Sequence, residues 1–191
     1  AEEATPALIK ALEGEDHHVR VSVAIALARI RPGSAQDIPA LLQDLKAPDA
    51  RRREEAAMAL GAMKPGPSQA ISPLIAALGD DAWYVRTAAA WALGNMGLEA
   101  RPAIGALVRT LSDADPHVRA SAATALGGLQ SKAREALPRL VKNLKDGDWH
   151  VRLRTLWSLY MIAPDSKETM SAFVDALGDA DGEVRANGAL G

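Results

Sequence analysis

The sequence contains no cysteine and few aromatic residues. Of its 191 residues only seven are aromatic, and four of those are tryptophan. Without cysteine the chain has no disulfide scaffold, no cysteine-ligated zinc finger and no thiol nucleophile. No apolar run approaches the roughly 18–20 residues that a membrane-spanning helix needs. We therefore expect no membrane partner.

An excess of positive charge is also missing, since 22 Lys and Arg stand against 24 Asp and Glu. Nucleic-acid-binding proteins usually carry a basic surface, so we expect no nucleic-acid partner. No signal peptide is recognisable at the start, and the first residue is Ala1 rather than methionine. We expect a soluble chain, in the cytoplasm rather than exported, and an exported mature form stays open.

What the sequence has in abundance is alanine. Hydrophobic residues make up 48% of the chain, and alanine is the most frequent of them. This hydrophobic content excludes intrinsic disorder as the ordinary interpretation. Alanine is the best helix former and has almost no side chain, so a core built from alanine and leucine predicts helices that approach one another closely.

A fixed period runs through the chain without gaps, and such self-similarity indicates a repeat architecture. An arginine recurs at this 33-residue spacing in six successive units: Arg20, Arg53, Arg86, Arg119, Arg152 and Arg185. A leucine column has the same register: Leu12, Leu45, Leu78, Leu111, Leu144 and Leu177. We expect one domain over residues 1–191, with five full repeats and a partial sixth: 6–38, 39–71, 72–104, 105–137, 138–170 and 171–191.

Each repeat is predicted to consist of two helices joined by a short acidic turn. In Pro39 to Lys46 the leucines have helical spacing. An aspartate such as Asp115 then stands where it can cap the second helix, and Pro116 suits the first helical position. The second helix should run about 14 residues and end near a glycine such as Gly127. No strand-like alternation is present, so the predicted fold class is all-α.

These residues resemble a known family. The pattern Pro-x-Leu-[Ile/Leu/Val]-x-x-Leu, then Asp-x-x-Val-Arg, then Ala-x-Ala-Leu-Gly is similar to the short HEAT-like repeat of bilin (phycobilisome) lyases, and it covers the whole chain. Ankyrin repeats share the period, but their Thr-Pro-Leu-His signature is absent. The resemblance implies an α-solenoid, a right-handed superhelix whose second helices line a concave surface.

The repeated charged residues are interpreted as structural. The resemblance implies that the six arginines form a ladder with aspartates that bridges successive repeats, and a residue repeated so uniformly is a poor candidate for catalysis. Trp83 and Trp149 begin second helices, where we expect them to cover the turn, with a place at the edge of the groove as the alternative.

The positions that vary between repeats predict the functional surface. A helical wheel of the unit that starts at Val118 places Ala122, Ala125, Leu126 and Leu129 on its core side. The outward arc carries large apolar and aromatic residues at its centre, including Met58, Trp91 and Trp157. An exposed apolar row usually marks an interaction site, and tryptophan, tyrosine and arginine are frequent hot-spot residues. The predicted partner-binding residues are Arg51, Tyr84, Trp91, His117, His150, Arg154 and Trp157, and packing of Trp91 and Trp157 between helices is the alternative.

No catalytic or metal site is predicted. His117 and His150 occupy the same place in adjacent repeats, roughly 8–10 Å apart, which is too far to share an ion at about 2.0–2.1 Å. There is no His-Glu dipeptide, no phosphate-binding glycine loop and no nucleophile elbow. We expect no catalytic residue, no metal and no cofactor.

The predicted function is therefore a non-catalytic scaffold whose concave groove binds a partner protein. One alternative is a bilin-lyase-type enzyme or subunit that handles a tetrapyrrole, as the resemblance implies. Another is a structural subunit of a larger assembly, with end-to-end association through the C-terminal repeat. Excision of alkylated bases by a groove with tryptophan is a further alternative, which the acidic net charge disfavours.

Overall fold

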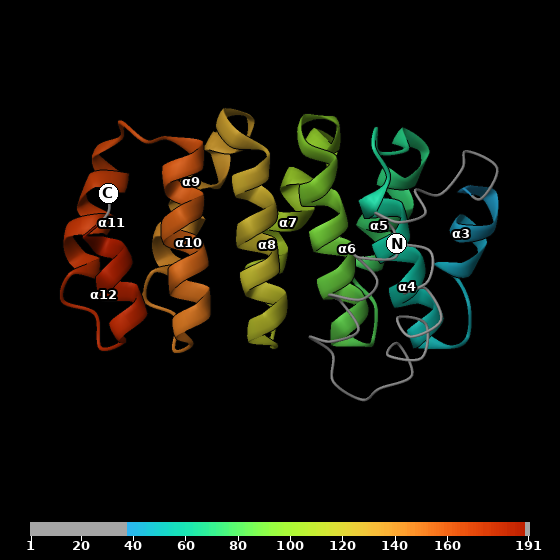
Figure 1. The fold of residues 1–191 in the computed structure, drawn as a ribbon, viewed down its shortest axis with the longest axis horizontal. Helices are drawn as coiled ribbons and strands as arrows, with labels where there is room; N and C mark the ends of the chain where they lie inside the picture. The colour runs from blue at the N-terminus through green and yellow to red at the C-terminus, as the bar shows by residue number, and fades with distance from the viewer. Residues whose placement is uncertain (1–37, 190–191) are drawn as a thin grey trace, which may run out of the picture. The chain divides into compact units, whose positions relative to one another are not determined.

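The computed structural model describes residues 38–189, and every regular element in that range is a helix (Figure 1). The predicted first repeat, residues 6–38, therefore lies outside the described residues except for its last position. This applies to His17, His18 and Arg20, whose predicted places cannot be compared with the structure.

The 33-residue period of the sequence reappears in the starting points of the helices. The second helices of the repeats begin at this interval and are α4 (Ala50–Ala62), α6 (Trp83–Met96), α8 (Pro116–Gly128), α10 (Trp149–Ile162) and α12 (Gly182–Gly188). Four first helices keep the same interval: α3 (Ile38–Asp44), α5 (Ile71–Ala77), α7 (Ile104–Thr110) and α9 (Leu137–Asn143). The prediction of two helices per repeat is confirmed.

Short 3₁₀ segments precede three of the first helices: η2 (Ser68–Ala70), η3 (Gly97–Ala103) and η4 (Gln130–Ala136). The last first helix, α11 (Lys167–Ala176), has no such segment and starts earlier than the period requires. Its early start is explained by Ser166, whose side chain accepts a hydrogen bond from the Thr169 N–H at 3.1 Å. A serine in this position caps a helix by satisfying a free N–H group.

Aspartates begin most of the second helices, as the sequence predicts. The capping residues Asp49, Asp115, Asp148 and Asp181 each accept a hydrogen bond from the N–H two residues ahead. Helix α6 lacks this residue because Ala82 stands in its place. There the N–H of Ala82 donates to Asp80 at 2.9 Å, so the aspartate two residues earlier orders the turn.

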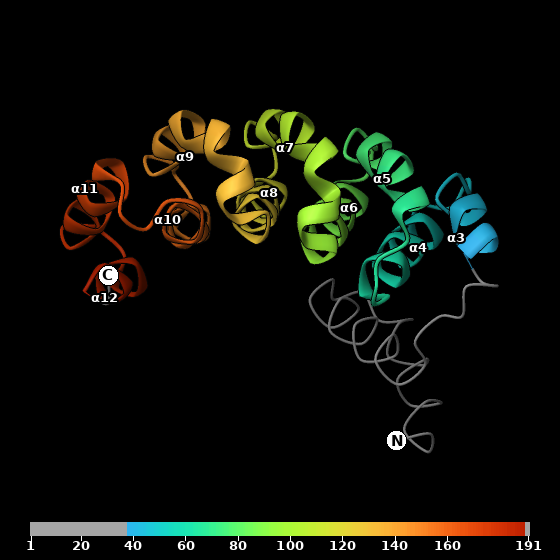
Figure 2. The same cartoon turned by 90° about the horizontal axis from the view of Figure 1, so that it is seen from above.

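The chain divides into two compact units, residues 1–96 and 97–191, called here the N-terminal and the C-terminal unit. In the N-terminal unit α6 packs against α4 and α5, and in the C-terminal unit α10 packs against α8, α9, α11 and α12. Within each unit, the first helices form one layer and the second helices another (Figure 2). The prediction of one domain over the whole chain stays a prediction.

Alanine allows the second helices to approach closely. Ala89 and Ala90 on α6 are fully buried, and so are Ala122 and Ala123 at the same register on α8. The core side predicted for α8 is confirmed, because Val118, Ala122, Ala125, Leu126 and Leu129 are all at most 2% exposed. Alanine thus favours the helical conformation and, because its side chain is small, also lets neighbouring helices pack closely.

Candidate protein-binding surface

One face of α10 carries a continuous row of exposed side chains. His150, Arg154, Trp157 and Met161 are spaced by four, three and four residues, which places them on one side of a helix. All four are exposed, Trp157 by 38% and Met161 by 47%. The opposite side of α10 is buried in the C-terminal unit. We call these four residues the α10 surface.

Hydrogen bonding and aromatic contacts hold Trp157 in place. Its indole Nε1 donates to Oδ1 of Asn187 on α12 at 3.2 Å. Its ring meets Tyr160 edge to face, with centroids 6.0 Å apart, and Tyr160 meets Phe173 of α11 in the same way at 6.0 Å. Edge-to-face geometry is the preferred arrangement of aromatic pairs. Trp157 is thus both exposed and oriented, as a binding anchor must be.

The start of α10 orients His150. The N–H groups of His150 and Val151 both donate to Oδ1 of Asp148, at 2.9 and 3.3 Å. The imidazole lies on the ring of Trp149, with centroids 3.5 Å apart and an angle of 29° between the planes. Trp149 is the first residue of α10, as predicted, and its ring supports a neighbour that belongs to the α10 surface.

Sequence reasoning missed one residue of this surface, Met161, and one neighbour of it, Tyr160. Met161 continues the row of His150, Arg154 and Trp157 by one more helical turn, so the spacing alone could have found it. Tyr160 is 43% exposed and in contact with Trp157. The sequence indicates Tyr160 less clearly as a surface residue, because no aromatic residue stands at this register in the preceding repeats.

The neighbouring helix α8 offers smaller groups on the same side. His117 and Thr124 are exposed there, at the registers of His150 and Trp157. The hydroxyl of Thr124 donates to the carbonyl of Ala120 in the preceding turn at 3.0 Å. The Thr124 hydroxyl is therefore already hydrogen-bonded within its own helix. The aromatic side chain at this register, Trp157, belongs to α10.

The N-terminal unit carries the other three predicted residues. Arg51 is exposed near the start of α4, and Tyr84 and Trp91 are half-buried on α6. Trp91 lies against α4, because a β-carbon added to Gly61 would come within 2.9 Å of its ring. Met58, which the sequence placed at the centre of the outward arc, is only 2% exposed. That expectation for Met58 was wrong, since its side chain is part of the core.

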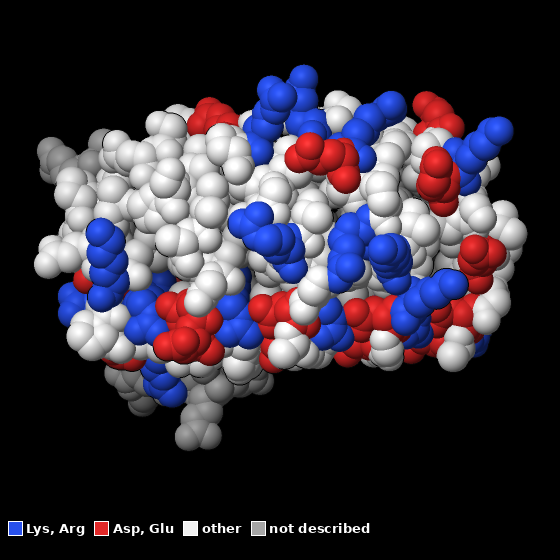
Figure 3. All heavy atoms as spheres, turned by 180° about the vertical axis from the view of Figure 1, so that it is seen from behind, with Lys and Arg blue, Asp and Glu red and all other residues white. Residues whose placement is uncertain are grey.

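The arginine column makes contacts that bridge successive repeats. In three of its members the guanidinium binds an aspartate of the next repeat through two parallel hydrogen bonds of 2.6–2.8 Å. The pairs are Arg53–Asp80, Arg119–Asp146 and Arg152–Asp179. The third nitrogen of each guanidinium, Nη1, donates to two carbonyls of the preceding turn. Figure 3 shows basic and acidic side chains alternating along one edge of the face it displays. This geometry supports the structural interpretation of the column.

The acidic partners form a column that the sequence analysis did not single out. Asp80, Asp146 and Asp179 stand two residues before the position that caps the next helix. The hydrogen bonds from Arg152 lower the pKa of the Asp179 carboxyl. Burial opposes ionisation of Asp80 and Asp146, but their hydrogen bonds outweigh it and lower the pKa of both. The 33-residue register contains this column and could have revealed it.

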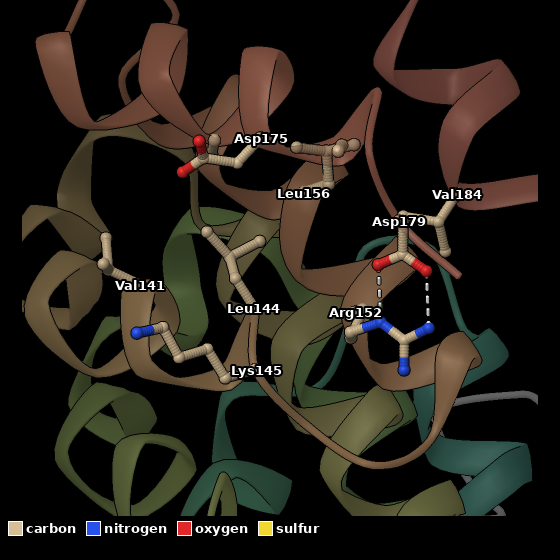
Figure 4. Close-up of a pocket in the computed structure, with 10 residues that line it drawn as sticks. Val141, Leu144, Lys145, Arg152, Leu156, Asp175, Asp179 and Val184 are labelled. Atoms are coloured by element: carbon tan, nitrogen blue, oxygen red, sulfur yellow. Dashed lines mark hydrogen bonds and ion pairs between the residues drawn. The ribbon is translucent and has the colours of Figure 1, made fainter. Parts of the chain in front are cut away.

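A cavity of about 290 Å³ lies among α9, α10, α11 and α12 (Figure 4). Apolar side chains such as Val141 and Leu144 line most of it. Its charged lining residues are Lys145, Asp175, Arg152 and Asp179. The last two bind each other, as the dashed lines in Figure 4 show. Binding pockets orient ligands through a few polar groups that converge on them, and this pair is already engaged.

Residues 38–189 contain no group of three side chains that could hold a metal ion. No helix in the same range is long and apolar enough to cross a membrane.

Comparisons with known proteins agree with this fold. A family model of HEAT repeats matches residues 1–61, 38–111 and 104–191. No curated protein matches the sequence. An engineered protein is 27% identical, with a TM-score of 0.60 over 97% of this chain and 93% of that one. A designed armadillo repeat protein in complex with the peptide (KR)4 is 24% identical, with a TM-score of 0.63 over 97% and 96%.

A natural structure is similar as well. The complex of CpcE and CpcF of phycocyanin lyase from Nostoc sp. PCC7120 is 23% identical, with a TM-score of 0.66 over 96% of this chain and 74% of that chain. At this level of identity the likeness concerns the fold. These structural neighbours are helical-repeat proteins, and one of them holds a peptide.

Proposed function

Since the chain belongs to the HEAT-repeat family, we propose that it is a protein-binding scaffold and that the α10 surface is its principal contact with a partner protein. The observation that carries the proposal is Trp157, an indole that is 38% exposed and yet held by Asn187 and Tyr160. A rigid aromatic side chain loses little conformational entropy when a partner covers it.

The composition of the α10 surface suggests how a partner would be recognised. Trp157 and Met161 supply apolar area at its centre and its end, and Tyr160 extends that area toward α11. Arg154 and His150 supply hydrogen-bond donors beside it. An apolar centre with polar groups around it is the usual anatomy of a protein interface. Of the predicted binding residues, Trp91 in the N-terminal unit supports the proposal least, because its ring packs on Gly61.

The test is affinity capture from a lysate of the source cells with the full chain and two variants. Trp157→Ala should lose the bound partner. Leu98→Ala removes another exposed apolar side chain, 55% exposed in η3 and away from α10, and should keep it. Retention of the same partner by Trp157→Ala would overturn the role given to the α10 surface.

A cross-linking experiment places the partner directly. A photoreactive amino acid at Met161 should cross-link the captured protein, and the same group at Arg109, on the first-helix layer, should not. Absorbance spectra of the captured material address the lyase alternative, because a bound tetrapyrrole absorbs visible light. A chromophore that is captured with the full chain and is lost in the Trp157→Ala variant would favour the enzyme over the scaffold.

A further inference from the structure

The cavity among α9, α10, α11 and α12 lies where two small residues replace longer ones of the preceding repeat. Ala172 and Ala176 of α11 line it and stand at the 33-residue registers of Arg139 and Asn143 on α9. Asn143 is only 6% exposed, and its amide donates to the carbonyl of Leu111 at 3.0 Å. The space that two polar side chains occupy between one pair of repeats is thus left open between the next pair.

The same replacement leaves a backbone acceptor without its side-chain donor. Leu144 lines the cavity and stands at the register of Leu111. Ala176 cannot supply the N–H group that Asn143 gives to Leu111, and no other donor reaches the Leu144 carbonyl among residues 38–189. Because a buried carbonyl requires a donor, a donor group on a ligand can take the place of the missing amide.

Two opposite charges stand at the mouth of the cavity. Lys145, just after α9, and Asp175 on α11 are both exposed and both line it. Figure 4 shows their charged ends on one side of the cavity, away from the pair Arg152–Asp179. Within the described part of the chain, neither side chain makes an ion pair. A ligand that carries one charge of each sign can therefore engage both.

We propose that this cavity binds a small zwitterion with an apolar side chain, of the class of free hydrophobic α-amino acids. The ligand's side chain lies among Val141 and the other apolar lining residues, where it is removed from water. Its ammonium group pairs with Asp175 and donates to the Leu144 carbonyl, and its carboxylate accepts from Lys145. The cavity volume of about 290 Å³ is just below the range of about 300–1,000 Å³ of most ligand pockets, which suits a ligand of this size.

The direct test is an NMR titration of the isotope-labelled full chain with L-leucine up to about 10 mM. We expect saturable shifts of residues on α9 and α11, with a Kd of about 1 mM or below. Three matched ligands each lack one recognised group: isoamylamine lacks the carboxylate, isocaproate the ammonium and L-alanine most of the apolar side chain. Each should bind at least about tenfold more weakly than leucine.

Variants of the cavity test the site itself. Ala172→Arg combined with Ala176→Asn introduces the side chains of the preceding repeat, so it fills the cavity with residues that this fold already accommodates and should abolish binding. Asp175→Asn and Lys145→Met each remove one exposed charge and should weaken binding by about tenfold or more. Glu168→Gln removes another exposed charge of α11, outside the cavity, and should leave leucine binding unchanged.

Circular dichroism establishes that each variant is folded, and the two single variants at exposed positions keep the test decisive if the double variant does not fold. Absence of saturable leucine binding by the full chain would overturn the proposal. So would equal binding of leucine by Asp175→Asn and Lys145→Met, or equal binding of isoamylamine and isocaproate. None of these changes alters the α10 surface, so the result is independent of the capture of a partner protein.

Discussion

Trp91 in the N-terminal unit and Trp157 in the C-terminal unit occupy the same register of the repeat and have different surroundings. Trp91 lies over Gly61 of α4 and is half-buried. At the corresponding place in the other unit, the three atoms nearest to a β-carbon added to Gly127 of α8 all belong to Ser158. Trp157 instead reaches Asn187 and Tyr160 and stays 38% exposed. The same residue at the same repeat position is packing in one unit and surface in the other.

The largest expected difference is in the stability of the two tryptophan variants. Trp91→Ala removes a ring that packs on a neighbouring helix and should lower the free energy of unfolding by about 2–3 kcal/mol. Trp157→Ala removes a more exposed ring and should cost about 1 kcal/mol or less. Urea unfolding followed by circular dichroism measures both. Equal losses would show that the two tryptophans have the same structural role.

The two glycines at this register of α4 and α8, Gly61 and Gly127, give the next effect. A β-carbon on Gly61 would lie 2.5 Å from the Cα of Ala92, so Gly61→Ala should force α4 and α6 apart. On Gly127 its nearest contacts are with Ser158 at 3.1–3.4 Å. Overpacking destabilises a protein by about 1–3 kcal/mol, whereas replacing glycine by alanine inside a helix stabilises it by about 1 kcal/mol through helix propensity. Gly61→Ala should therefore be destabilising and Gly127→Ala nearly neutral in thermal unfolding.

A double variant separates the two contacts of Gly61. The closest atom is the backbone of Ala92 and not the ring of Trp91. Combining Gly61→Ala with Trp91→Ala should therefore not restore stability. Full recovery in the double variant would mean that the ring alone limits the approach of α4 and α6.

The Arg152–Asp179 pair should make the stability of the C-terminal unit depend on pH. The pKa of Asp179 lies below its ordinary value of 3.8 in the folded chain. Its contribution is therefore present above about pH 4 and is lost as the pH falls through the folded pKa. Asp179→Asn should lower the free energy of unfolding by about 1–2 kcal/mol at neutral pH. It should also reduce the further decline of that free energy as the pH falls. Urea titrations from neutral to acidic pH measure this, with exposed Asp175→Asn as the control that keeps the decline.

The smallest effect concerns two corresponding residues at the ends of second helices. Gly97 has a φ of 61° and Gln130, one repeat later, a φ of 51°. This left-handed conformation costs an ordinary residue about 1 kcal/mol relative to glycine. Gln130→Gly should raise the unfolding free energy by up to about 1 kcal/mol, and Gly97→Ala should lower it by a similar amount. A loss of stability in Gln130→Gly would contradict this account.

Much of the fold was predictable because the repeat leaves several independent signals in one register. The capping aspartates such as Asp115 and Asp148, the buried face of α8 and the starts of the helices all follow from local chemistry. Met58 was placed wrongly because a helical wheel does not show what covers a side chain. The aspartates that bind the arginines recur in the same 33-residue register and could have been found, but the register does not show which aspartate each arginine binds, because the partner lies 27 residues further on in the next repeat.

The candidate surface was predictable only in part. His150, Arg154 and Trp157 have the spacing of one helix face, and the structure places them together on α10. Arg51, Tyr84 and Trp91 belong to the N-terminal unit, where Trp91 is held against Gly61. The contribution of Tyr160 depends on its contact with Phe173 of α11, which no local pattern on α10 contains.

The sequence by itself determined the all-α class, the 33-residue repeat and the caps, because each depends on a pattern of residues close together in the chain that recurs in every repeat. Tertiary structure alone decided which tryptophan packs on a neighbouring helix, which aspartate each arginine binds and which side chains surround Trp157. These depend on neighbours in other repeats, whose side chains determine how much of each surface is removed from water.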